Sequence, residues 1–219
     1  MLKLGEKGAI LQRDEKTYAI APHFPCGLIS KEQLRLVADV AEKHNAAVIK
    51  ITSAARMVLV GIQEEDIDNV WADLGISPGH AVGLCVRSIK ACPGTACCRL
   101  GKQDSLGIGM KLDETYHGME LPGKTKMAVS GCNNQCAENC IKDISLVGNS
   151  KGWNLMAGGM GTGKPRLADT VAEDLNSEEA LALISKTISF YKENAKKNER
   201  IGKMIDRIGL DTFKSGIDS

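Results

Sequence analysis

The stretch Lys126-Met-Ala-Val-Ser130-Gly-Cys132-Asn-Asn-Gln-Cys136 joins a short predicted strand to a pair of cysteines. A second cysteine group, Cys92-Pro-Gly-Thr-Ala-Cys97-Cys98, follows another predicted strand at residues 81–89. A predicted helix over residues 104–118 separates the two groups. Strands and a helix that alternate around cysteine-bearing loops indicate an α/β domain.

The first 77 residues are predicted to form a smaller α+β unit. Its strand candidates are residues 17–22, 47–52 and 57–62. Its helix candidates are residues 31–44, for which Ser30 is the expected N-cap, and residues 64–74, which end before Gly75. The order of strand, helix, strand, strand and helix is typical of a ferredoxin-like half domain.

The whole chain is therefore expected to be an α+β protein in three parts. A ferredoxin-like half occupies residues 1–77, an α/β cysteine-bearing domain occupies residues 78–176, and a helical tail occupies residues 177–219. A further strand is expected at residues 143–147.

The composition argues against a disordered chain, a nucleic-acid-binding protein and a membrane protein. The chain has 219 residues, of which 43% are hydrophobic and 25% are charged, and these values suit a folded protein with a core rather than a disordered chain. The net charge of +1 gives no support to a nucleic-acid groove or a polybasic membrane patch. No apolar run is long enough to span a membrane, and the first residues contain no signal-peptide stretch. We therefore expect a soluble, cytoplasmic protein that binds neither nucleic acid nor membranes.

Net positive charge is concentrated in the middle of the chain. Residues 85–166 contain 11 Lys and Arg against 6 Asp and Glu, whereas the rest of the chain has a net negative charge. A basic segment that also contains the cysteine groups favours a site for a strongly anionic cofactor or substrate.

The eight cysteines indicate a metal site. In a reducing cytosol, thiols remain reduced unless they hold metal or perform redox chemistry. Five residues separate Cys92 from Cys98, and three separate Cys132 from Cys136. Short intervals suit a four-iron cluster, whereas structural zinc favours two to four intervening residues. Spacing alone leaves three interpretations open: an iron–sulfur cluster, zinc, and inert buried cysteines.

The surroundings of the cysteines carry a more specific signal. The motifs are Arg87-Ser-Ile-Lys-Ala-Cys92-x5-Cys98-Arg99, then Lys124-Thr-Lys126 before Gly131-Cys132-x-Asn134-x-Cys136, then Leu146-Val-Gly148, with Lys50-Ile-Thr52-Ser-Ala-Ala-Arg56 upstream. Together they resemble the sirohaem-dependent sulfite and nitrite reductases, over about residues 20–170. Two-repeat members of that family carry the unit twice, and this chain resembles the small, single-repeat sulfite reductases of anaerobes.

The resemblance implies two coupled cofactors. Cys92, Cys98, Cys132 and Cys136 would ligate a [4Fe–4S] cluster, and Cys136 would also bridge to the sirohaem iron. Cys97 falls between matched positions and is interpreted as a non-ligand. Cys26, Cys85 and Cys140 are interpreted as buried thiols. Further sirohaem contacts are implied at Thr52, Arg99, Asn134 and Gly159.

The resemblance also implies a cationic substrate pocket formed by Arg56, Arg87, Lys124 and Lys126. Sulfite is a small dianion and sirohaem carries several carboxylates, so both need donors that stay cationic. Lysines crowded by other cations have a lowered pKa and can donate the protons that S–O cleavage requires.

The stretch Gly158-Gly-Met-Gly-Thr-Gly163-Lys164 is similar to a phosphate-binding loop but does not match the full motif. Pro165 stands where that motif needs Ser or Thr, and no long buried strand is expected before it. The family has a glycine-rich stretch here, where backbone lies close to sirohaem.

The resulting hypothesis is an enzyme that reduces sulfite to sulfide at a sirohaem–[4Fe–4S] centre. The sequence contains no flavin or nicotinamide motif, so electrons are expected from an external ferredoxin-type carrier. The alternatives are nitrite reduction to ammonia, an electron-transfer iron–sulfur protein without sirohaem, and a zinc-stabilised binding module. A homodimer is expected, because a single repeat would present its cysteines and its basic residues on separate faces.

Overall fold

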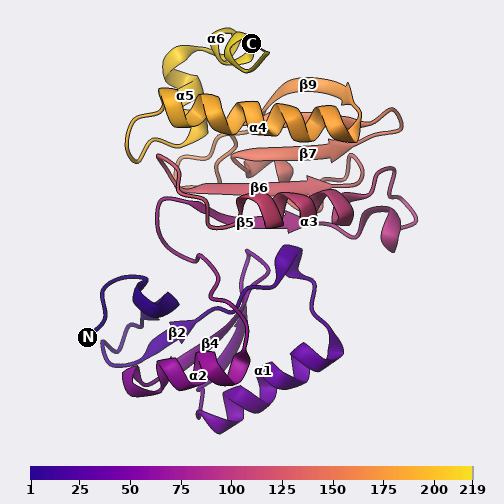
Figure 1. Cartoon of the computed structure of the whole chain (residues 1–219). Helices are drawn as coiled ribbons and strands as arrows, with labels where there is room; N and C mark the ends of the chain where they lie inside the picture. Colours follow the sequence, from indigo (N-terminus) through magenta and orange to yellow (C-terminus); the bar gives the residue numbers. More distant parts are fainter. Residues whose placement is uncertain (219) are drawn as a thin grey trace. The chain divides into compact units, whose positions relative to one another are not determined.

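The computed structural model describes residues 1–218, which divide into two compact units, Met1–Gly83 and the described residues from Leu84 onward (Figure 1). Both units combine helices with a single β-sheet, as an α+β protein requires. Among the described residues no helix is both long enough and apolar enough to cross a membrane.

The first unit is built on a four-stranded antiparallel sheet in the order β1-β2-β4-β3. The strands are β1 (Ala9–Leu11), β2 (Tyr18–Ile20), β3 (Val48–Ile51) and β4 (Met57–Ile62). The helices are α1 (Lys31–Lys43) and α2 (Ile67–Leu74), with short 3₁₀ turns at Glu6–Gly8, Pro25–Gly27 and Glu64–Asp66. Apolar side chains of the helices and the sheet form one core.

Local signals set the ends of these helices. The Ser30 side chain accepts a hydrogen bond from the Gln33 N–H, and the Gln33 side chain bonds back to the Ser30 backbone, which is a capping box. Gly75 ends α2 with a φ of +56°, in the left-handed region that favours glycine. The predicted strands and helices of this unit are confirmed, and β1 is an addition that the sequence did not indicate.

The second unit contains a five-stranded sheet in the order β5-β6-β7-β8-β9. The strands are β5 (Val86–Ala91), β6 (Thr125–Ser130), β7 (Ile144–Gly148), β8 (Trp153–Ala157) and β9 (Asp169–Leu175). β5, β6 and β7 are parallel, whereas β8 and β9 are antiparallel to their neighbours. The helices are α3 (Ser105–Tyr116), α4 (Ser177–Asn194), α5 (Ile201–Ile208) and α6 (Leu210–Asp218), and 3₁₀ turns lie at Gly94–Ala96 and Asn139–Ile141.

Figure 1 shows α3 in front of β5 and β6, and α4 in front of the β8–β9 end of the sheet. The helix predicted over residues 104–118 and the helical tail are confirmed. The strand expected at 81–89 is wrong in position, because β5 begins at Val86 and the preceding residues make only an isolated bridge, from Cys85 to Glu120. β8 and β9 were not predicted.

The unit boundaries differ from the expected division. The first unit extends to Gly83, and the helical tail belongs to the second unit. Ala180, Ile184 and Ile188 of α4 are buried, and α4 packs on β8 and β9. Burial of this apolar face makes the tail part of the core of the second unit.

Candidate metal centre and basic cluster

The two cysteine groups lie at the same edge of the second sheet. Cys92 directly follows β5, and Cys132 follows β6 after a single intervening residue. β5 and β6 are adjacent and parallel, with Ala91 paired to Val129. The carboxyl ends of neighbouring parallel strands meet at one edge, so the topology brings the two cysteine loops together.

Glycines allow the two loops to pack backbone to backbone. A Cβ on Gly131 would lie 2.6 Å from the Gln103 carbonyl oxygen and 2.8 Å from the Gly94 Cα, so no side chain fits there. The Gly131 carbonyl accepts hydrogen bonds from the N–H groups of Lys102 (2.7 Å) and Gln103 (3.1 Å). These backbone contacts hold the two loops in register.

The environment of Cys92 favours a metal-binding thiolate. Its sulfur accepts a hydrogen bond from the Gly131 N–H at 3.1 Å and lies 3.3 Å from the Ser105 hydroxyl. Burial raises the pKa of Cys92, but the Ser105 hydroxyl and the N–H groups of Gly131 and Gly94 outweigh it and lower that pKa. The thiolate is the form that binds iron or zinc.

A buried polar network supports the second cysteine loop. Asn139 is fully buried, and its Oδ1 accepts a hydrogen bond from the Ser130 hydroxyl at 2.5 Å, while its amide donates to the Leu146 carbonyl at 2.8 Å. The Ser130 Oγ also accepts from the Ala137 N–H, next to Cys136. Nothing in the local sequence marked Asn139, because its partners come from two different strands.

The solvent exposure of the other cysteines agrees in part with the predictions. Cys98 and Cys136 are exposed and Cys132 is half-buried, so three of the predicted ligands are accessible. Cys97 is exposed like Cys98, and the choice between them therefore stays a prediction. Cys26 and Cys85 are buried as predicted, whereas Cys140 is only half-buried and its carbonyl accepts from the Ala168 N–H.

Three cations gather near the start of β5 and β6. Arg87 is the second residue of β5, Lys124 immediately precedes β6, and Arg200 immediately precedes α5. The pKa of Lys124 is lowered, first by burial and then by the charges of Arg87 and Arg200. The pKa of Arg87 is likewise lowered by burial and by Arg200.

An ion pair that the sequence did not indicate anchors this basic cluster. Arg200 donates from Nε to Asp143 Oδ1 at 2.8 Å and from Nη2 to Oδ2 at 2.6 Å, and Asp143 is fully buried. The same carboxylate accepts a hydrogen bond from the Lys126 N–H at 2.8 Å. Because 57 residues separate Arg200 from Asp143, only the fold brings them together.

The cysteine loops and the basic cluster lie at opposite ends of the same strands. Arg87 precedes Cys92 by five residues, and a strand rises about 3.3 Å per residue, so the two are about 16 Å apart along β5. Lys126 precedes Cys132 by six residues along β6, which is about 20 Å. Arg87 and Lys126 are therefore separated along the strands from the cysteines of their own copy, whereas Lys102 lines the cavity that contains Cys132.

The other predicted residues are distributed over both units. Arg56 and Thr52 belong to the first unit, where the Thr52 hydroxyl accepts from the Arg56 N–H and Arg56 Nη2 donates to the His80 carbonyl. Arg99 is exposed on the first cysteine loop. Asn134 lines a cavity of about 320 Å³ next to Cys132, together with Lys102 and Asn149.

Gly159 is buried beside the segment that follows the second cysteine loop. A Cβ on Gly159 would lie 2.6 Å from the Lys142 carbonyl oxygen and 2.7 Å from the Cys140 carbonyl oxygen. A strand, β8, ends at Ala157 before this glycine-rich stretch, but it has only five residues of alternating burial and is not the long buried strand of a phosphate-binding loop. The stretch returns into β9 rather than into a helix, so it still differs from a phosphate-binding loop.

Two models of known protein families match this chain. A family model described as "Nitrite and sulphite reductase 4Fe-4S domain" matches residues 82–219, and one described as "Nitrite/Sulfite reductase ferredoxin-like half domain" matches residues 10–75. The chain belongs to the nitrite and sulphite reductase family. It is therefore an oxidoreductase, and the family's cofactors are a [4Fe–4S] cluster and sirohaem.

Relatives of this reductase include a protein of similar length and much longer proteins. It is 45% identical to "Sulfite reductase, assimilatory-type" of Nitratidesulfovibrio vulgaris, over 96% of this chain and 97% of the relative. It is 37% identical to "Nitrite reductase [NAD(P)H]" of Bacillus subtilis, over 94% of this chain but only 26% of that relative.

Solved structures of low sequence identity share the fold of this reductase. The dissimilatory sulfite reductase I structure matches with a TM-score of 0.83 at 13% identity, covering 93% of this chain and 69% of that chain. Mycobacterium tuberculosis NirA matches with a TM-score of 0.80 at 19% identity, covering 92% of this chain and 40% of that chain.

The donor set of the reductase fits the cluster. Cys92 carries hydrogen bonds that stabilise a thiolate, and the other three predicted ligands are accessible on loops at the same sheet edge. Thiolates on short loops are the ligands that iron–sulfur clusters take.

Replacing Arg200 by methionine is expected to lower the free energy of unfolding by about 3–5 kcal/mol, because Asp143 would be left as a buried, uncompensated charge. Urea titration at neutral pH measures this effect. The matched control is Lys151→Met, which removes an exposed ion pair with Asp174 and should change the urea midpoint little. Equal midpoint changes in the two variants would contradict the anchoring role of Arg200.

Proposed function

We propose that this reductase converts sulfite to sulfide with electrons from an external ferredoxin-type carrier. Its family reduces sulfite or nitrite, and the relative that it matches over nearly its whole length is named a sulfite reductase. The observation that carries the proposal is the meeting of two cysteine loops at one edge of a parallel sheet, in a unit whose basic cluster suits an anionic substrate. Nitrite, the substrate named for several longer relatives, is the second candidate.

The proposal assigns separate tasks to the two ends of the sheet. Cys92, Cys98, Cys132 and Cys136 hold the cluster at the carboxyl end. When bound, the cluster and sirohaem supply electron storage and the redox chemistry. At the other end, Arg87, Lys124 and Lys126 bind the dianion, and the two lysines deliver protons to the departing oxygens. Arg56 is a further candidate for binding the dianion. The lowered pKa of Lys124, caused by burial and by Arg87 and Arg200, makes its ammonium a better acid.

The visible spectrum of protein purified without oxygen tests the cofactor assignment. Strong Soret and red bands indicate sirohaem, and a broad shoulder near 400 nm alone indicates an electron-transfer iron–sulfur protein. A colourless, zinc-containing protein would contradict both. Steady-state comparison of sulfite with nitrite, using one reduced donor, then distinguishes the two substrates by their kcat/KM values.

We also propose that the functional form is a two-fold homodimer with shared sites. The cysteines and cations of one copy lie at opposite strand ends, and an isologous interface would supply each cluster with the partner's basic residues. A second observation favours self-association. Strand β3 is a sheet edge whose apolar residues Val48, Ile49 and Ile51 are 42–66% exposed, and such edges are normally covered.

Complementation between two inactive variants tests the shared site. Cys136→Ser and Lys124→Ala subunits, co-expressed with different affinity tags and purified through both tags, should recover about half of the wild-type activity, because one of two centres is intact. The matched control pairs Cys136→Ser with a Cys136→Ser/Lys124→Ala double variant and should stay inactive. A protein that is monomeric by light scattering, with inactive mixed preparations, would show that each chain builds its own site.

A further inference from the structure

A carboxylate on the second cysteine loop is bound by two lysines. Glu138 lies two residues after Cys136, and its Oε2 accepts hydrogen bonds from Lys142 Nζ at 2.8 Å and from Lys90 Nζ at 3.2 Å. The Glu138 side chain is 48% exposed, whereas those of Lys142 and Lys90 are only 6% and 18% exposed. Two largely buried ammonium groups therefore converge on one carboxylate oxygen.

Lys90 connects this carboxylate to the first cysteine loop. It is the fifth residue of β5, two residues before Cys92, and 48 residues separate it from Glu138. The Cys92 N–H donates to the Val129 carbonyl at 3.0 Å and extends the pairing of β5 with β6, so Cys92 is fixed relative to Lys90. The ion pair between Lys90 and Glu138 therefore links the two cysteine loops through side chains, in addition to their backbone contacts.

The backbone of the second cysteine loop requires such support. Gln135 and Glu138 have φ values of +49° and +62°, in the left-handed region that favours glycine. Other residues keep this conformation only where their surroundings hold them in it. The Glu138 N–H donates to the Gln135 carbonyl at 2.8 Å, and the Glu138 side chain is held by the two lysines. Cys136 lies between the two left-handed residues, so its position depends on these contacts.

Stability alone does not account for the contact with Lys90. An ion pair that involves a half-exposed carboxylate contributes little to the free energy of unfolding. The buried ammonium of Lys142 is also compensated by Glu138 whether or not Lys90 takes part. What Lys90 adds is a fixed distance between β5 and the second cysteine loop.

We propose that Lys90 and Glu138 are positioning residues of the [4Fe–4S] cluster, whose ion pair holds Cys136 in place relative to Cys92 so that both thiolates bind one cluster. This inference rests on the ligand assignment of the proposed function. Groups that orient metal ligands slow the loss of the metal, because a ligand that detaches is kept close to its binding position.

The experiment measures cluster loss from the anaerobic holoprotein in the presence of a ferrous-iron chelator. Lys90→Met removes the link to β5 and leaves the pair of Glu138 with Lys142, so the thermal midpoint should change little. The loss of acid-labile sulfide is expected to become about 10–100-fold faster. Glu138→Gln should act in the same direction. Lys90→Arg keeps a cation at this position and should restore a rate near that of the wild type.

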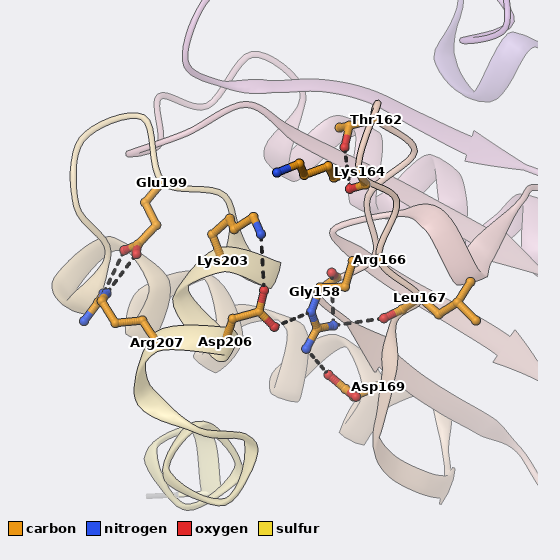
Figure 2. Close-up of polar contacts among 10 residues, drawn as sticks. All are labelled: Gly158, Thr162, Lys164, Arg166, Leu167, Asp169, Glu199, Lys203, Asp206 and Arg207. Atoms are coloured by element: carbon orange, nitrogen blue, oxygen red, sulfur yellow. Dashed lines mark hydrogen bonds and ion pairs between the residues drawn. The ribbon is translucent and has the colours of Figure 1, made fainter.

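A second carboxylate with two cations provides the matched control. Asp206 of α5 is 46% exposed, accepts a hydrogen bond from Arg166 Nε at 2.8 Å and lies 3.5 Å from Lys203 Nζ (Figure 2). Lys203→Met, like Lys90→Met, removes one of two cations and leaves the carboxylate with the other. None of these three residues belongs to a cysteine loop, so Lys203→Met should lose sulfide at the wild-type rate.

The outcomes separate this inference from the proposed function. Equal rates of sulfide loss in Lys90→Met and Lys203→Met would overturn the role of the ion pair, and so would a rate in Lys90→Arg as fast as that in Lys90→Met. In either case, sulfite turnover by the wild-type protein would still stand. A wild-type protein that contains no acid-labile sulfide would instead contradict the proposed function, and this inference with it.

Discussion

Replacing Cys136 by serine is expected to abolish both cofactors at once. Cys136 lies on the exposed second cysteine loop, and it is the predicted ligand that bridges the cluster to sirohaem. A serine hydroxyl does not replace a thiolate, so iron, acid-labile sulfide and the Soret band should all fall to background. Their measurement in one anaerobic preparation checks the result.

Cys97→Ser is the matched variant for this prediction. Cys97 is a neighbouring exposed cysteine that falls between the positions matched in the resemblance and is predicted not to be a ligand. The iron content of Cys97→Ser should therefore stay near that of the wild type. Cys98→Ser should behave like Cys136→Ser with respect to the cluster. Loss of the cluster from Cys97→Ser, with retention in Cys98→Ser, would reverse the ligand assignment.

Lys124→Ala and Lys126→Ala are each expected to retain sirohaem and lose turnover by about 10²–10³-fold, the usual effect of removing a donor that stabilises developing negative charge. The measurement is kcat with sulfite at equal sirohaem and cluster content. Lys111→Ala, which removes an exposed lysine of α3, is the control and should keep wild-type turnover. Turnover within about threefold of wild type in both site variants would show that these two lysines are ordinary solvent-facing residues without a role in turnover.

The pH dependence gives this prediction a second readout. Burial and the neighbouring cations Arg87 and Arg200 lower the pKa of Lys124, and a lysine that donates protons loses activity as pH rises through that pKa. Arg87→Gln removes one of those cations and raises the pKa of Lys124. The alkaline limb of its pH–rate profile should therefore move to higher pH, and a shift to lower pH would exclude Lys124 as the donor.

The sequence by itself determined the local elements and the cysteine chemistry. Helix α1 was predicted from its apolar periodicity and the Ser30 cap. The end of α2 was predicted from Gly75, which adopts the left-handed conformation at the C-cap. The short intervals between cysteines indicated a metal site because ligand spacing is a local property, and the resemblance of the surrounding motifs implied a [4Fe–4S] cluster. Strands β1, β8 and β9 escaped prediction: β1 has only three residues, and β9 contains Asp169, Glu173 and Asp174, residue types that are uncommon in strands.

Only the tertiary structure decided which groups surround those local signals. Arg200 and Asp143 lie 57 residues apart, Arg166 and Asp206 lie 40 apart, and Asn139 depends on partners in two strands. The parallel order of β5 and β6 also decided that the two cysteine loops share one edge of the sheet while Arg87 and Lys124 lie at the other. Hydrogen bonds and ion pairs act over a few ångströms of space and leave no periodic trace along the chain. The residues that support this site therefore became visible only once the strands were in order.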